Sequence, residues 1–162
     1  MAKYSPQFVT YTGDAVADGR DQGLWEDWFE ALQEYWLTPE GYLIPILPCL
    51  GNHERNAINY YKEYLLPGNE QWCSVNYAPY LHIICLNSEA DISGVQLSWL
   101  KGDLSKYCNC TWKVAFFHEP PYSSGPHGSR LDIREAWCPL FDKYHVDVVI
   151  CVTITITRDL SL

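Results

Sequence analysis

The sequence predicts a layered α/β domain with a mixed sheet. Short apolar runs typical of strands alternate with segments whose apolar residues recur at helical spacing, the pattern of strands connected by helices. In the middle of the chain, only a tight turn at Ala78-Pro79 separates two strand-like runs, so one hairpin is expected. The chain has 162 residues, of which 48% are hydrophobic, and this length suits one domain with a core of its own.

The first half of the chain contains two predicted strands and two predicted helices. One helix places Trp25, Trp28 and Leu32 at helical spacing, and the other is short and rich in tyrosine. The second strand contains Pro45 and Pro48, which exclude a helix and favour an edge strand or a bulge. In order, the segments are residues 8–12 (strand), 22–36 (helix), 44–50 (strand) and 57–65 (helix).

The second half adds four strands and two helices around a loop. The loop at 119–130 is rich in Pro, Ser and Gly, and one helix is amphipathic through Val95, Leu97, Leu100 and Leu104. The last strand is wholly apolar apart from Asp147 and is expected to be buried. In order, the segments are residues 72–77 and 80–87 (strands), 94–106 (helix), 112–117 (strand), 132–143 (helix) and 146–150 (strand).

Charge and composition exclude several classes of function. The net charge is −9, and an acidic surface repels phosphate backbones, so we expect no nucleic-acid partner. No apolar stretch approaches the roughly 20 residues that span a bilayer, so we expect no membrane partner. The seven Cys form no Cys-x-x-Cys pair; a disulfide framework is the less favoured alternative to thiols in the core. The sequence defines neither localisation nor oligomeric state.

Polar side chains that can bind a metal follow two of the predicted strands in the first half. Asp14 comes after strand 8–12, where a carboxylate can bridge two cations, although a turn aspartate or helix N-cap is the plainer reading of Asp14 taken alone. After strand 44–50 comes Gly51-Asn52-His53-Glu54. Asn52 offers a neutral oxygen ligand and His53 a proton near neutral pH, whereas the plainer reading is a surface turn.

A third candidate follows strand 112–117. His118 ends the apolar run and is followed at once by Pro120 and Pro121, which stiffen the loop and suit a site that needs a fixed imidazole. His127 lies in the same loop and is a weaker candidate for contact with substrate. His82 and His145 lie in or beside strands and are interpreted as structural.

Together these motifs resemble the calcineurin-like metallophosphoesterases, most closely the branch that includes the purple acid phosphatases. The family pattern is, in order, Asp-x-His, Gly-Asp, Gly-Asn-His-Asp/Glu, a strand-end His and Gly-His-x-His. This sequence matches the middle three, and the resemblance extends from about Gln7 to Ile150. It implies an α/β/β/α sandwich with mixed sheets, incomplete in this chain.

The resemblance also implies roles. Asp14 would bridge two metals, Asn52 and His118 would ligate the second metal, and His53 would act on the leaving group or stabilise the transition state. The metals would be transition metals such as Fe, Zn or Mn. The substrate would be a small phosphorylated molecule, and the reaction would be phosphate ester hydrolysis by metal-bound hydroxide at a dinuclear site.

The sequence departs from the family pattern in three places. No Asp-x-His precedes Asp14, and Ala17 stands where purple acid phosphatases have a tyrosine. At the other end, Val152-Thr-Ile-Thr-Ile-Thr-Arg158 replaces Gly-His-x-His. One choice of codons for Gly-His-Asn-His-Asn-Tyr-Ala-Arg, read after loss of its first base, encodes this peptide residue for residue. We therefore expect a chain shortened at both ends, with a partial metallophosphoesterase domain at 1–151 and a frameshifted tail at 152–162, a hypothesis that resequencing the locus tests.

The expected consequence is an impaired site. With one imidazole missing from the second metal and little but Asp14 left for the first, the sequence predicts weak binding of a single metal and little turnover. The alternative is a non-catalytic remnant, or a metal-binding or interaction module of the same fold.

Overall fold

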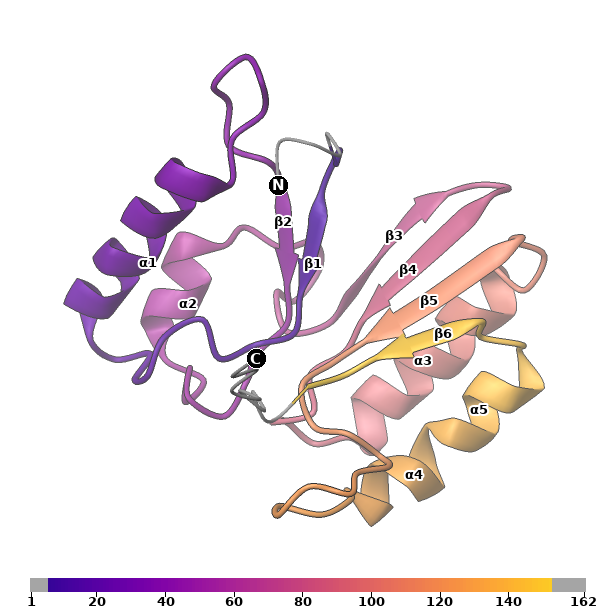
Figure 1. Ribbon diagram of the computed structural model, residues 1–162. Helices are drawn as coiled ribbons and strands as arrows, with labels where there is room; N and C mark the ends of the chain where they lie inside the picture. Colours follow the sequence, from indigo (N-terminus) through magenta and orange to yellow (C-terminus); the bar gives the residue numbers. More distant parts are fainter. Residues whose placement is uncertain (1–5, 153–162) are drawn as a thin grey trace, which may run out of the picture.

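The computed structural model describes residues 6–152, which form two sheets that face each other (Figure 1). The first sheet has two parallel strands, β1 (Val9–Tyr11) and β2 (Ile46–Pro48). The second has four strands, in the order β3 (Cys73–Tyr77), β4 (Leu81–Cys85), β5 (Trp112–Phe116) and β6 (Val148–Ile150). The β3–β4 pair is antiparallel, and the other pairs are parallel. The predicted mixed sheet and its hairpin are therefore confirmed.

Helices cover the outer side of each sheet. Figure 1 shows α1 (Gln22–Tyr35) and α2 (Ile58–Glu63) beside the two-stranded sheet. The other helices, α3 (Gly94–Lys106), α4 (Leu131–Ala136) and α5 (Cys138–Lys143), lie against the four-stranded sheet. The layers run helix, sheet, sheet, helix, which confirms the expected α/β/β/α arrangement. Among the described residues, no helix is long and apolar enough to cross a bilayer.

The four-stranded sheet packs on both faces because side chains along each strand point alternately to one face and the other. Ile83, Cys85 and Phe116 belong to the apolar cluster between the two sheets. Ile84 and Ala115, one position along, belong to the cluster that packs against α3, α4 and α5.

A third apolar cluster holds α1 and α2 and fixes the loop after β1. Trp25 of α1 is fully buried in a cluster with Tyr60 of α2, Tyr64 just after α2 and Leu50 just after β2. Its indole Nε1–H donates to the carbonyl of Gly19 at 2.9 Å. Packing of α1 therefore sets the path of the chain between Asp14 and the helix.

The predicted helix 132–143 is two helices. α4 ends at Ala136 and α5 begins at Cys138, with Trp137 between them. Pro139 has no N–H to donate to the carbonyl of Glu135, and its ring crowds that carbonyl, so a single continuous helix is disfavoured here. Apolar periodicity continues through the break, which is why periodicity alone predicts one helix.

The predicted burial of the last strand is wrong. Val148, Val149 and Ile150 keep 45%, 37% and 37% of their surface exposed. β6 is the last strand in the order of its sheet and pairs with β5, so one of its edges has no neighbouring strand among residues 6–152. Of the tail predicted at 152–162, residues 153–162 lie outside the described part of the chain.

Candidate metal centre

Three loops that are far apart in the sequence meet at the carboxyl ends of parallel strands. Asp14 follows β1, Asn52 follows β2, and His118 follows β5. β1 and β2 are parallel, so their carboxyl ends share one edge. The Nδ1 atom of His118 lies 2.7 Å from the carbonyl oxygen of Thr12, which joins the end of β5 to the end of β1.

Asp14, Asn52 and His118 present their ligand atoms to one another. The Nε2 atom of His118 lies 3.0 Å from Oδ1 of Asn52 and 3.3 Å from Oδ2 of Asp14. The His118 side chain is only 1% exposed, whereas Asn52 is exposed. The structure thus brings together an imidazole nitrogen, a carboxylate oxygen and an amide oxygen at the surface end of a buried histidine.

The hydrogen bond to Thr12 fixes how His118 can act. Its Nδ1–H donates to the Thr12 carbonyl, so Nε2 is the nitrogen that faces Asn52 and Asp14. Metal-binding histidines usually donate their other ring N–H to a carbonyl or carboxylate, which sets the tautomer and the ring orientation. The surroundings of His118 follow this pattern.

Charge at the site is balanced between His118 and Asp14. Burial opposes the charge on His118, but hydrogen bonds to Asp14 and Thr12 outweigh it and raise the pKa of His118 to about 9. Burial likewise opposes the charge on Asp14, while hydrogen bonds from His118 and from the backbone of His53 hold the pKa of Asp14 below its ordinary value. Without a metal, a proton on Nε2 occupies the position that a cation would take.

Glu54 is a structural centre of the site that the sequence did not reveal. Its side chain is fully buried, and its two carboxylate oxygens accept backbone N–H groups from Asp14 at 2.9 Å, Ala15 at 2.5 Å and Gly51 at 2.6 Å. One carboxylate therefore fastens the loop after β1 to the loop after β2. Its place in the string 51–54 was the only signal available in the sequence.

Two glycines allow these loops to approach closely. Gly13 has a φ of +88°, and a Cβ added there would lie 2.6 Å from the backbone nitrogen of Gly51. A Cβ added to Gly51 would lie 2.5 Å from the backbone nitrogen of Asp14. Asp14 itself has a φ of +59°, in the left-handed region that residues other than glycine seldom adopt. The position of the Asp14 carboxylate thus depends on strained, tightly packed backbone.

His53 lies at the exposed rim of the site. Its backbone N–H donates to Oδ1 of Asp14 at 3.0 Å, and its ring Nδ1 lies 2.9 Å from the carbonyl of Ala17. With Nδ1–H donating to Ala17, Nε2 is the nitrogen left to take or give a proton. The structure therefore places His53 beside Asp14 with its ring accessible to a ligand.

His127 is placed differently. It lies in an exposed turn closed by a hydrogen bond from the Gly128 N–H to the carbonyl of Gly125. Within residues 6–152, no hydrogen bond or ion pair joins its side chain to Asp14, Asn52 or His118. The structure brings the three predicted ligands and His53 together but does not bring His127 to them.

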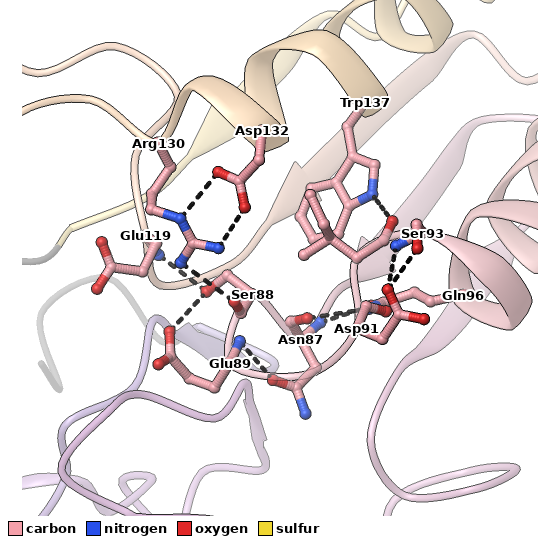
Figure 2. A network of polar contacts seen from close by, with 11 residues as sticks. Asn87, Ser88, Glu89, Asp91, Ser93, Gln96, Glu119, Arg130, Asp132 and Trp137 are labelled. Atoms are coloured by element: carbon pink, nitrogen blue, oxygen red, sulfur yellow. Dashed lines mark hydrogen bonds and ion pairs between the residues drawn. The ribbon is translucent and has the colours of Figure 1, made fainter.

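A polar network links the loop after β4 to the loop after β5, beside His118. Figure 2 shows Ser88 at its centre. The Ser88 hydroxyl accepts the Glu119 N–H at 3.0 Å and donates to Oε1 of Glu89 at 3.1 Å, and Arg130 reaches the Ser88 carbonyl at 3.4 Å. Burial raises the pKa of Glu89; the Ser88 hydrogen bond opposes this, the charge of Glu119 adds to it, and the charge of His118 counteracts it. Glu89 is thus a further acidic neighbour of the site that sequence analysis missed.

The residues present fit one transition-metal ion. A carboxylate, an imidazole and an amide oxygen are ligands that Zn, Mn and Fe accept, and three protein ligands leave positions for water or substrate. Within residues 6–152, no cluster of three or more His, Cys, Asp or Glu side chains is arranged to hold a metal. A site here therefore depends on the amide of Asn52 as its third ligand.

Comparison with known proteins reveals relatives much longer than this chain. It is 27% identical to an uncharacterised protein of Mycobacterium tuberculosis over 93% of its own length, and 28% identical to purple acid phosphatase 23 of Arabidopsis thaliana over 89%. It spans about a third (34%) of the length of each of these relatives.

The fold is found in solved structures. The chain resembles GAP50, described as the anchor in the inner membrane complex of Plasmodium, with a TM-score of 0.69 over 93% of this chain and 56% of that one. At 15% identity, this likeness supports the fold alone. The sequence profile of the calcineurin-like phosphoesterases matches residues 2–151. This match covers nearly the whole chain, which therefore belongs to the calcineurin-like phosphoesterase family.

Proposed function

We propose that the chain binds a divalent or trivalent transition metal, Fe, Zn or Mn, through Asp14, Asn52 and His118, and that this site serves the hydrolysis of phosphate esters. The observation that carries the proposal is the approach of Asn52 Oδ1 and Asp14 Oδ2 to the Nε2 atom of His118, 3.0 and 3.3 Å away, while Nδ1 is held by Thr12. Family membership and the purple acid phosphatase relative support a small phosphorylated substrate.

The metal and the residues around it would have different roles in the reaction. A bound metal supplies Lewis-acid chemistry, polarising a phosphoryl oxygen and lowering the pKa of water. Glu54 holds the backbone of Asp14 so that the carboxylate faces His118. His53, with its ring at the rim, is placed to give a proton from Nε2 to the leaving group of a bound ester.

Turnover by this chain is expected to be slight. Two-metal phosphoesterases stabilise both the attacking and the leaving oxygen between two cations. The described residues offer one set of three ligands, and one of the three is a neutral amide. The same observation favours the second candidate, a metal-binding or interaction module that retains the fold without measurable catalysis.

Metal titration of the purified chain tests the proposal. Isothermal titration with Mn²⁺ and with Zn²⁺ should show one binding event, which is lost in His118→Ala and weakened at least tenfold in Asn52→Ala. Asn109→Ala is the matched control. Asn109 is exposed in the turn before β5, at the other end of that strand from His118. Unchanged binding in both site variants would overturn the proposed ligands.

Hydrolysis of p-nitrophenyl phosphate then separates the two candidate functions. Metal-dependent turnover that is abolished in His53→Ala, with metal binding retained, supports the phosphoesterase. Metal binding without turnover above that of the metal-free chain supports the binding module.

A further inference from the structure

Cys73 and Cys85 face each other across the antiparallel pair of β3 and β4. The register pairs them directly, at the end of the pair away from the turn. Residues directly opposite in such a pair have Cα atoms about 4.5 or about 5.5 Å apart, and their side chains point to the same face. Both spacings lie within the roughly 4.4–6.8 Å that a disulfide spans. The strands therefore hold these cysteines at a separation that a disulfide requires.

The two thiols also share one environment. The residues are 4% and 0% exposed, and both side chains belong to the apolar cluster between the sheets. Hydrogen bonding with the Cys85 thiol lowers the pKa of Cys73, whereas burial raises the pKa of Cys85. Cys73 stands at the start of β3, the outermost strand in the order of its sheet, and so is the thiol that fraying of this strand would expose first.

We propose that Cys73 and Cys85 are a modification site, a cross-strand disulfide formed by exchange with a small-molecule disulfide such as oxidised glutathione. The Cys73 thiolate attacks the glutathione disulfide, forming a mixed disulfide and releasing one glutathione thiolate. The Cys85 thiolate then attacks Sγ of Cys73 and releases the second. The protein loses two electrons and two protons, and glutathione disulfide is reduced to two thiols.

The bond would lock an edge strand to its neighbour. Among residues 6–152, β3 pairs only with β4, and Ser74 of β3 is fastened to α3 through a hydrogen bond to Asp103 at 2.8 Å. His82 of β4 contacts the same carboxylate at 2.7 Å. Closing residues 73–85 into a loop removes conformations from the unfolded chain, so the oxidised protein is more stable than the reduced one.

Peptide mapping of the oxidised full chain tests the site directly. No Lys or Arg lies between residues 63 and 100, so trypsin leaves both cysteines on one peptide, whereas Cys49 lies on the peptide 21–55. After incubation with oxidised glutathione, we expect peptide 63–101 to contain an internal disulfide. Chymotrypsin then cleaves after Tyr80, between the two cysteines. The fragments that contain Cys73 and Cys85 should stay joined by the disulfide until it is reduced.

Variants and stability provide the second measurement. Oxidation should raise the midpoint temperature of unfolding by about 5–10 °C, reversibly with dithiothreitol. Cys73→Ser and Cys85→Val should each abolish the shift, and Cys49→Ser, altered at a buried cysteine of the same cluster, should retain it. A bond from Cys49 to Cys85, or thiols at Cys73 and Cys85 that still alkylate after refolding in a glutathione redox buffer, would overturn the proposal. None of these measurements depends on metal binding or catalysis.

Discussion

At the scale of single residues, the proposed site combines side chains that would bind the metal with groups that hold those side chains in place. The Nε2 atom of His118 faces the Asp14 carboxylate and the Asn52 amide oxygen. Glu54 instead holds the backbone N–H of Asp14, and the Thr12 carbonyl holds Nδ1 of His118. Glu54 satisfies three backbone N–H groups at once. A buried polar group left without a partner costs about 1–3 kcal/mol, so this one side chain has a large effect on stability.

Replacing Glu54 should therefore disturb both folding and metal binding. Glu54→Ala leaves three N–H groups, one buried and two partly buried, without their acceptor, and we expect the free energy of unfolding to fall by about 3 kcal/mol. Glu54→Gln keeps one acceptor oxygen and should lose less. Urea denaturation measures the change, with the exposed Glu26→Ala of α1 as control. A Glu54→Ala chain as stable as the control would show that these bonds do not hold the loops.

The raised pKa of His118 should make the proposed metal binding depend on pH. Below about pH 9 a proton occupies Nε2, so a metal ion must displace it. We expect the apparent affinity for Zn²⁺ to fall by up to about tenfold per pH unit as the pH drops from 9 towards the ordinary value of 6.5. Titrations across this range give the slope, and an affinity independent of pH would contradict it.

The stability of the metal-free chain should follow the opposite trend, increasing as the pH falls. Because folding raises the pKa of His118, the protonated side chain stabilises the folded state. This stabilisation is complete below the pKa of the unfolded chain, about 6.5, and is lost as the pH rises through about 9. Comparing the free energy of unfolding of this chain with that of His118→Asn across the pH range isolates the contribution of this histidine. Equal pH profiles for the two proteins would show that the proton on His118 does not stabilise the fold.

At the scale of elements, the loops after β4 and β5 act as one unit. Arg130 binds Asp132 with two hydrogen bonds, at 2.9 and 2.7 Å, and also reaches the Ser88 carbonyl, while Arg134 donates to the Pro121 carbonyl at 2.9 Å. The planar fork of a guanidinium makes such contacts in several directions, which a lysine ammonium does not reproduce. These contacts hold the loops after β4 and β5, which lie beside His118, in fixed positions.

Arg130→Lys should loosen the loop without unfolding the protein. We expect faster hydrogen exchange at residues 119–130, because the link to Ser88 is lost, and a change in unfolding free energy of about 1 kcal/mol or less. Arg20→Lys is a matched control: Arg20 also binds a carboxylate two residues away, that of Asp18, in an exposed loop. Unchanged exchange at 119–130 would mean that Arg130 does not brace the loop.

At the scale of the whole molecule, the four-layer sandwich leaves one apolar edge exposed. The three residues of β6 are all β-branched and partly exposed, and the strand has a neighbour on one side only among the described residues. Open strand edges pair readily with other chains unless charges or prolines protect them. Within β6 itself there is neither.

Self-association should therefore depend on β6. We expect the apparent mass of the chain in light scattering to rise with concentration, and Val149→Lys to suppress that rise by placing a charge on the edge strand. Val95→Lys is the control, since Val95 is a strongly exposed valine of α3 that lies outside any strand. Equal effects of the two substitutions would point to general surface charge instead of the strand edge.

The sequence by itself predicted most of the elements and identified the candidate ligands. Periodicity located the strands and most of the helices, and the polar residues that follow three strands marked Asp14, Asn52 and His118 as candidates, because both signals are local. The tertiary structure decided what depends on distant partners. Glu54 acquires its role from N–H groups up to 40 residues away, and β6 is exposed because an apolar strand is buried only where other layers cover it. Burial and hydrogen-bond partnership are properties of the packed chain, which no local pattern contains.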